Sequence, residues 1–213
     1  DRFGNTDSAY SFDGDDWIQL NHSQYLDFSI SDEYTLSCWV KVDANHTAGS
    51  IYEKWDGSSN TPYPYVLRIH DFISSGRYIG GYPQDYTTNQ TVTANSNILN
   101  SELYNNMVSV FTPNQILLYV NGNLVSQSTN NMNDGGNTSN VVDISLGRRL
   151  NSNNRFFSGD IDDFSIWNRA FTETEIQQLA NPSTYAWSTG DTTANISVSP
   201  TETTEYWVDV TTN

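Results

Sequence analysis

Hydrophobic and polar residues alternate along much of the chain, and the clearest case is the segment 35–42. Leu36, Cys38 and Val40 fall on one face of this segment, whereas Trp39 and Lys41 fall on the other. Because the side chains of a β-strand point alternately to its two faces, the pattern predicts a strand with one buried face. Similar short segments predict further strands at residues 9–12, 17–20, 50–55, 65–70, 77–82, 90–94, 106–111, 115–121, 142–147 and 159–167.

Turn signals and one helix signal complete this pattern. Asn121-Gly122 lies between two hydrophobic runs, which is a strong signal for a β-hairpin. Thr172 and Glu175 have the spacing of a capping box and are followed by Ile176 and Leu179, so we expect a short helix that ends before Pro182. Many short strands with a single helix predict an all-β, two-sheet antiparallel sandwich of the jelly-roll type.

A change in composition near residues 180–184 predicts a boundary. We expect a β-sandwich over residues 1–181 and a small β tail over residues 182–213. The tail has short strand signals at residues 185–187, 194–198 and 205–210, separated by Ser, Thr, Pro and Gly. About thirty residues are too few for a complete domain, so the tail either begins a neighbouring module or packs on the sandwich.

The charge of the chain restricts its partners. There are 9 basic and 25 acidic residues, a formal net charge of -16. A surface this acidic repels nucleic acid and anionic membranes, and it favours a cation or a neutral ligand. The sequence has no apolar run of roughly 18 residues, so we expect no membrane insertion. Cys38 is the single cysteine, and its hydrophobic setting predicts a buried residue rather than a nucleophile.

Four segments in order resemble a known family: residues 12–18, 34–40, 118–122 and 157–168. Together with the helix that follows them, they are similar to laminin-G-like, concanavalin A-like lectin and glucanase domains. The resemblance covers residues 5–180. It implies a structural calcium ion near the first turn and the strand at residues 159–163. The tail resembles the closing strands of the Ig-like or PKD-like repeats of large secreted proteins of Bacteroidetes-type bacteria.

Two clusters of aspartates are candidate calcium ligands. Asp13, Asp15 and Asp16 share one tight turn, and carboxylates this close repel one another unless a cation lies among them. The second cluster contains Asp160, Asp162 and Asp163, and the resemblance implies that both clusters share one ion. Strand alternation predicts that Asp162 faces inward with Phe164 and Ile166, and that Asp163 faces outward. The alternative is a solvated acidic turn.

No known catalytic signature is present in the sequence. Glu33, Glu53 and Glu102 are too scattered to form the paired carboxylates of a glycoside hydrolase. His70 lacks the accompanying Gln that alginate-lyase-type relatives carry. The sequence contains neither a Gly-x-Ser-x-Gly motif nor a plausible Cys–His pair. These absences favour a binding module, with a polysaccharide lyase or glycoside hydrolase of the same fold, or a structural spacer, as the alternatives.

A candidate sugar-binding surface lies between residues 55 and 86. Sugar rings stack on Trp and Tyr, and their hydroxyl groups pair with planar polar side chains. Arg68 is expected to point out of the core, because Leu67 and Ile69 occupy the opposite face of the same strand. Arg148, Arg149 and Arg155 are close in sequence and are suited to an anionic group on a glycan. The alternative is that the aromatic residues belong to the core. The candidate ligand-binding residues are Trp55, Asp56, Tyr63, Tyr65, Arg68, His70, Arg77, Tyr82, Tyr86, Arg148 and Arg149.

These features together favour a non-catalytic carbohydrate-binding or adhesion module. We expect a monomer that binds a polysaccharide or glycoconjugate, contains calcium, and is joined to neighbouring domains of a larger protein. We also expect that protein to be secreted or to lie on the cell surface, with its export signal upstream of this sequence.

Overall fold

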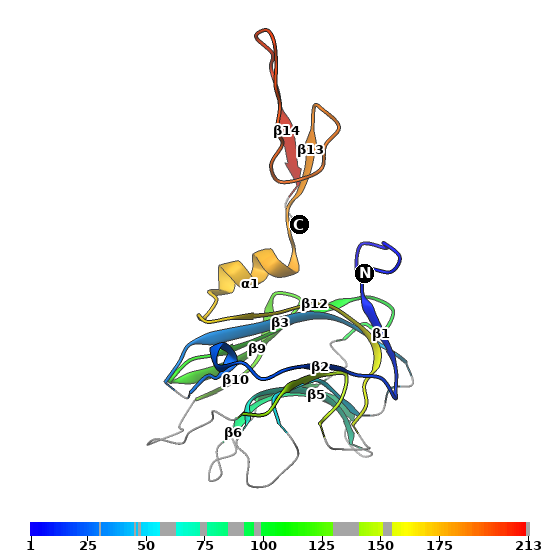
Figure 1. The fold of residues 1–213 in the computed structure, drawn as a ribbon, viewed down its shortest axis with the longest axis vertical. Coiled ribbons are helices and arrows are strands. Elements are labelled where there is room, and N and C mark those ends of the chain that lie inside the picture. The colour runs from blue at the N-terminus through cyan, green and yellow to red at the C-terminus, as the bar shows by residue number, and fades with distance from the viewer. Residues whose placement is uncertain are drawn as a thin grey trace.

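In the computed structural model, the described strands between residues 10 and 167 form two six-stranded antiparallel sheets that pack face to face (Figure 1). The structure describes residues 1–29, 31–44, 46, 48–55, 63–72, 76–84, 92–95, 99–129, 141–150 and 155–211, with the description of 63, 70–72, 76–84, 92–95 and 129 confined to the backbone. The expected all-β sandwich is therefore confirmed.

The first sheet, sheet A, has the strand order β1-β12-β3-β8-β9-β10. Its strands are β1 (Tyr10–Asp13), β3 (Tyr34–Val42), β8 (Asn105–Phe111), β9 (Gln115–Val120), β10 (Asn123–Thr129) and β12 (Ser158–Trp167). The expected hairpin joins β9 to β10, and Asn121 and Gly122 both have positive φ at its turn (50° and 77°).

The second sheet, sheet B, has the strand order β2-β11-β4-β5-β6-β7. Its strands are β2 (Ile18–Leu20), β4 (Gly49–Glu53), β5 (Tyr63–Phe72), β6 (Gly76–Gln84), β7 (Val92–Asn95) and β11 (Ile144–Leu146). A short 3-10 helix, η1 (Gln24–Leu26), follows β2.

The core lies between the two sheets and follows the predicted alternation. Leu36, Cys38 and Val40 of β3 are fully buried, and Leu67 and Ile69 of β5 face them from sheet B. The burial of Cys38 confirms its expected place as a small buried hydrophobe, and it raises the pKa of the thiol.

Helix α1 (Glu173–Ala180) covers the outer face of sheet A (Figure 1). Its Ile176 packs against Val108, Val110 and Tyr119, which point away from the main core. The predicted capping box is present, because the Thr172 side chain accepts from the Glu175 backbone N–H and the Glu175 carboxylate accepts from the Thr172 backbone N–H. In the described part of the chain, no helix is long and apolar enough to serve as a membrane span.

The tail forms a separate two-stranded sheet of β13 (Thr184–Trp187) and β14 (Val208–Thr211). It stands clear of the sandwich in Figure 1. The strand expected at residues 194–198 is wrong, because these residues adopt no strand. No described residue from 184 to 211 is buried, so this part of the tail has no hydrophobic core of its own.

Candidate functional site

The outer face of sheet B carries a buried ion cluster centred on Glu53. Arg68 lies on this face, as expected, because Leu67 and Ile69 point into the core. The Glu53 side chain is 0% exposed, and its carboxylate accepts hydrogen bonds from Ser50 Oγ and from Nε of Arg68. The Nε of Arg149 donates to the other carboxylate oxygen over 3.4 Å. The cluster therefore joins β4, β5 and the turn after β11.

The electrostatics of Arg149 reflect this crowded position. Burial lowers the pKa of Arg149, the charge of Arg68 lowers it further, and Glu53 opposes both effects. A buried charge is tolerated only where opposite charges and hydrogen bonds compensate for its lost hydration. The Glu53 carboxylate thus fixes two guanidinium groups in place.

Trp55 follows directly after this cluster and packs against both arginines. The guanidinium carbon of Arg149 lies 4.4 Å from the centroid of the Trp55 ring, and that of Arg68 lies 5.3 Å away. Such cation–π contacts hold an aromatic ring in one orientation. Three of the expected ligand-binding residues are therefore brought together by the fold.

Arg148 belongs to a second aromatic group beside the first. Its guanidinium carbon lies 3.4 Å from the centroid of the Trp17 ring and 5.8 Å from that of Phe156. Trp17 is 43% exposed. Within the described part of the chain, no carboxylate forms an ion pair with Arg148, and its buried Nε has no hydrogen-bond acceptor. Burial also lowers the pKa of Arg148.

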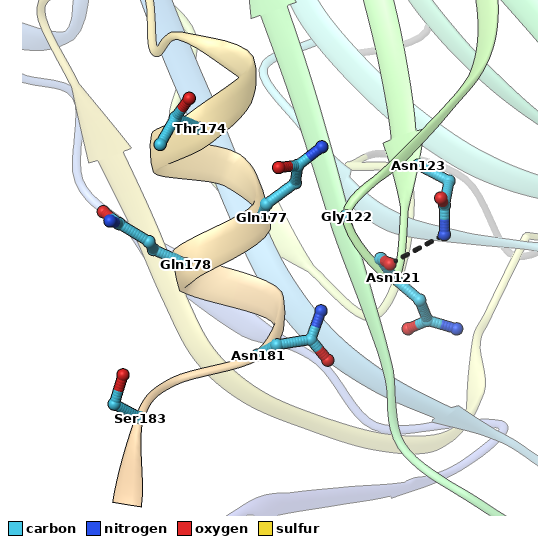
Figure 2. Close-up of a pocket in the computed structure, with 8 residues that line it drawn as sticks. All are labelled: Asn121, Gly122, Asn123, Thr174, Gln177, Gln178, Asn181 and Ser183. Atoms are coloured by element: carbon cyan, nitrogen blue, oxygen red, sulfur yellow. Dashed lines mark hydrogen bonds between the residues drawn. The ribbon is translucent and has the colours of Figure 1, made fainter. Parts of the chain in front are cut away.

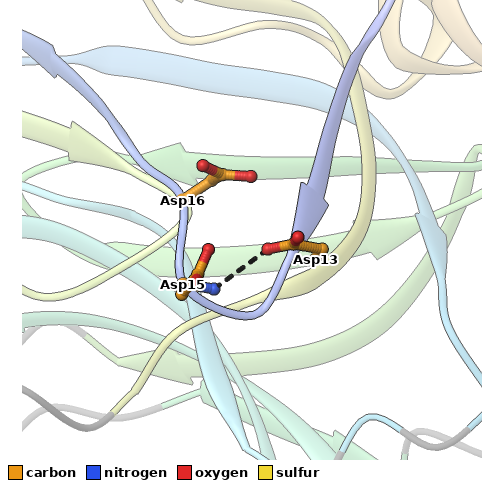
Figure 3. Close-up of side chains that lie close together, drawn as sticks. All are labelled: Asp13, Asp15 and Asp16. Carbon is orange, nitrogen blue, oxygen red and sulfur yellow. Dashed lines mark hydrogen bonds between the residues drawn. The ribbon is translucent and has the colours of Figure 1, made fainter.

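The acidic turn after β1 lies next to this second group. The carboxylate oxygens of Asp13, Asp15 and Asp16 lie within 4.8 Å of one another, and all three residues are exposed (Figure 3). The backbone N–H of Asp15 donates to Asp13 over 3.3 Å. A side-chain hydrogen bond with Asp13 and the charges of Asp13 and Asp16 raise the pKa of Asp15. This arrangement offers a cation three oxygen ligands from one turn.

The expectation that Asp162 and Asp163 share an ion with this turn is corrected by the register of the strands. Asp13 pairs with Ser158, so Asp162 lies four residues further along β12, roughly 13 Å away at about 3.3 Å per residue. The two carboxylates instead bind the guanidinium of Arg2, which reaches Asp162 over 3.4 Å.

The inward orientation expected for Asp162 is also wrong. A bulge interrupts the pairing of β12 with β3 between Asp162 and Ser165. Ile161 and Phe164 both pack on the core as a result, so Asp162 lies on the opposite face of the strand from Ile161. The third aspartate of this cluster, Asp160, accepts a hydrogen bond from the Tyr104 hydroxyl.

Tyr65 is a core residue rather than a ligand contact. It is fully buried, lies among Phe28 and Tyr34, and its hydroxyl donates to the Leu26 carbonyl over 3.4 Å. Tyr65 lies on the same inward face of β5 as Leu67 and Ile69, because residues two positions apart on a strand share a face. The expectation that Tyr65 contacts a ligand is therefore wrong. Tyr63, His70, Arg77 and Tyr82 lie on β5 and β6, with only their backbone described, and Asp56 and Tyr86 lie outside the described residues.

A separate polar cleft of about 370 Å³ lies between α1 and the β9–β10 turn (Figure 2). Two of the amide side chains that line it already form hydrogen bonds within the fold. Asn121 accepts from the Asn106 N–H and donates to Asn105, and Asn123 donates to the Asn121 carbonyl. Its lining residues are Asn121, Gly122, Asn123, Thr174, Gln177, Gln178, Asn181 and Ser183. None of these lining residues is aromatic, so the cleft lacks a ring on which a sugar could stack.

Reasoning from the sequence missed three residues of the site: Glu53, Trp17 and Phe156. Glu53 was considered only as a catalytic carboxylate. Its role depends on Arg149, which is 96 residues away in the chain. One feature of the sequence could have identified Trp17, namely its position directly after the acidic turn of Asp13, Asp15 and Asp16.

The fold and this site define the class of the protein as a two-sheet antiparallel sandwich of lectin-like architecture. A family model described as the concanavalin A-like lectin/glucanases superfamily matches residues 12–177. The chain therefore belongs to that superfamily. The match ends before the tail, so the likeness of the tail to Ig-like or PKD-like repeats stays a prediction.

Solved structures of similar fold come from several kinds of protein. NanB sialidase from Streptococcus pneumoniae has a TM-score of 0.60 at 19% identity, covering 80% of this chain and 27% of the sialidase chain. The botulinum neurotoxin serotype D binding domain has a TM-score of 0.61 at 16% identity, covering 84% of this chain and 47% of the other.

A heptameric SAP-like pentraxin from Limulus polyphemus is also similar, with a TM-score of 0.53 at 15% identity, covering 77% of this chain and 81% of the pentraxin. The present chain thus spans about a quarter of the sialidase and about half of the toxin domain. At these identities the likeness establishes the fold alone. No curated protein sequence matches the chain.

Proposed function

We propose that the chain is a non-catalytic carbohydrate-binding or adhesion module that uses the outer face of sheet B. The observation that carries the proposal is two tryptophan–arginine pairs next to strands β2, β4 and β11 of this sheet: Trp17 with Arg148, and Trp55 with Arg149. Aromatic rings offer apolar surfaces to the C–H faces of sugars, and guanidinium groups donate to their oxygens.

The surroundings of the site support binding rather than catalysis. Glu53, the fully buried carboxylate of this face, is held by Arg68, Arg149 and Ser50. A general acid would need a proton and an open path to its substrate. The module would belong to a secreted or cell-surface protein and act as a monomer beside neighbouring domains, and the net charge of -16 disfavours self-association.

A glycan array followed by calorimetry tests this function. The chain should bind at least one polysaccharide or glycoconjugate, and Trp17→Ala and Trp55→Ala should each weaken binding about tenfold, the loss expected for a stacking contact of 1–1.5 kcal/mol. Trp207→Ala is the matched control, because Trp207 is 60% exposed in the tail and far from the site. Failure to bind any glycan, or release of reducing ends or unsaturated products from the bound polysaccharide, would overturn the proposal.

We also propose that calcium occupies the turn of Asp13, Asp15 and Asp16. Calcium prefers six to eight oxygens, so three carboxylates would be completed by loop carbonyls and water. Because a bound ion stabilises the native state by mass action, millimolar calcium should raise the unfolding temperature and EDTA should reverse the rise.

Asp15→Asn should abolish this response to calcium, because it removes one ligand charge and relieves the repulsion within the turn. Asp209→Asn, an exposed aspartate of the tail, should retain the response. An Asp15→Asn protein that responds like the parent would count against the site.

A further inference from the structure

Arg148 is held in an unusual way for a partly buried cation. Its guanidinium lies against Trp17 and Phe156, and within the described residues it has neither a carboxylate partner nor an acceptor for its buried Nε. Arg2, Arg68, Arg149 and Arg169, by contrast, all pair with carboxylates. A partly buried cation without a counter-charge costs free energy, and its persistence in a native fold calls for an explanation.

The backbone that carries Arg148 is fixed on both sides. Gly147 has a φ of 85°, its N–H donates to the Ile51 carbonyl over 3.0 Å, and its carbonyl accepts from the Phe157 N–H over 2.7 Å. The Ser145 hydroxyl donates to the Arg148 carbonyl. The guanidinium is therefore held in place before any ligand arrives, which lowers the entropy cost of binding.

Stacking of a guanidinium on an aromatic ring leaves the N–H groups at its edge free to donate. These groups form a planar fork that matches the oxygens of a carboxylate or a sulfate. The position is open to solvent at Trp17, which is 43% exposed. Arg149, the next residue, is held in place by Glu53.

We propose that Arg148, supported by Trp17, binds the acidic group of an anionic polysaccharide, either the carboxylate of a uronic acid or a sulfate ester. This inference rests on the proposed carbohydrate-binding function and names its ligand class. The anion supplies, through the outer N–H groups, the counter-charge that the described carboxylates give to Arg2, Arg68, Arg149 and Arg169 but not to Arg148.

The experiment compares polysaccharides that differ only in their acidic groups, with calcium present. Polygalacturonate and its fully methyl-esterified form test the carboxylate, and dextran sulfate and dextran test the sulfate. The parent chain should bind one or both acidic polymers at least about tenfold more tightly than the neutral counterpart, as expected for a charge-assisted pair. A difference in affinity within the polygalacturonate pair identifies a carboxylate as the bound group, and a difference within the dextran pair identifies a sulfate.

Two variants connect that preference to Arg148. Arg148→Gln should remove it, and Arg148→Lys, which keeps the charge but lacks the fork, should reduce it several-fold. Arg169→Gln is the control, since Arg169 is an exposed arginine paired with Glu175 near the helix. Unfolding temperatures of all variants show whether each is folded. If Arg148→Gln does not fold, the effect of Arg148→Lys on the preference for acidic polymers decides whether Arg148 binds the anion.

The outcomes separate this inference from the function on which it rests. Equal binding of acidic and neutral polymers, or a preference that survives Arg148→Gln, overturns the role of Arg148 and leaves a carbohydrate-binding module. Absence of binding to every polysaccharide and glycan overturns both.

Discussion

The Nε of Arg149 donates to the carboxylate of Glu53 over 3.4 Å and thereby ties the turn after β11 to strand β4. Glu53 is fully buried, and Arg68 binds its other oxygen. The single carboxylate of Glu53 thus balances the positive charges of Arg68 and Arg149, the two arginines that pack against Trp55. The stability of the sandwich and the shape of the candidate ligand surface therefore depend on the same side chain.

Replacing Glu53 with glutamine should destabilise the sandwich strongly. The change keeps the shape of the side chain but removes the negative charge that Arg68 and Arg149 bind. Loss of one partner from a buried ion pair costs about 3–5 kcal/mol. Urea denaturation measures the change in the free energy of unfolding. Glu102→Gln, at an exposed glutamate, should alter it by less than about 0.5 kcal/mol. Equal effects of the two substitutions would show that the cluster is not a structural element.

The alternation of residues predicted most of the strands because it reflects a local property of the chain. The segment 35–42 was expected from Leu36, Cys38 and Val40, and the structure extends this strand by one residue to Tyr34–Val42. The capping box at Thr172 and Glu175 was equally local and is confirmed. The hydrophobic period of a strand and the capping box of a helix depend on residues a few positions apart, so both can be recognised in a single sequence.

The candidate site was only partly predictable because it depends on strand register. Arg68, Trp55 and Arg149 were expected and lie together. Tyr65 lies in the core rather than at the surface because it shares one face of β5 with Leu67 and Ile69. Asp162 was misplaced because the bulge in β12 reverses the alternation, and bulges leave no clear mark in a single sequence.

Removal of the tail after Asn181 should leave the sandwich intact. Tail hydrogen bonds such as those from Trp187 to Thr193 and from Ser188 to Trp207 stay within the tail. No described residue from 184 to 211 is buried. Calorimetry should therefore show an unfolding temperature within about 2 °C of the parent, since a loss of 1 kcal/mol shifts a domain of this size by 2–4 °C. A larger fall would show that the tail is part of the sandwich.

The ion pair at the start of α1 predicts a pH dependence. A hydrogen bond from Arg169 and the bonds from Thr172 lower the pKa of Glu175 from 4.5 to about 2. A carboxyl group whose pKa is lower in the folded state stabilises the protein above its unfolded pKa and loses that effect as the pH falls towards the folded value.

The stability difference between the parent and Glu175→Gln should accordingly be complete above pH 5, decline below about 4.5, and vanish near pH 2. Urea denaturation at pH 6, 4 and 2.5 measures it, and Glu102→Gln serves as the exposed control. A difference that stays constant across this range would contradict the lowered pKa.

Gly159 occupies a position where β3 and β12 approach too closely for any side chain. Its φ is 140°, and a Cβ atom there would lie 2.2 Å from the Lys41 carbonyl oxygen and 2.9 Å from the Phe157 ring. Gly14 also has a positive φ, 104°, but a Cβ at that position would meet no atom within 4 Å. Alanine substitutions at the two positions therefore distinguish the free-energy cost of a positive φ from the additional cost of a steric clash.

Gly14→Ala, measured in EDTA, should cost about 1–2 kcal/mol from the left-handed backbone alone. Gly159→Ala should cost a further 1–3 kcal/mol, because its Cβ meets backbone that cannot rotate away. Urea denaturation of both variants gives the comparison. Since β12 also pairs with β1, a displaced β12 should carry the acidic turn with it, so the response to calcium should weaken in Gly159→Ala as well. Equal losses of stability in the two variants would show that the strands move apart at little cost.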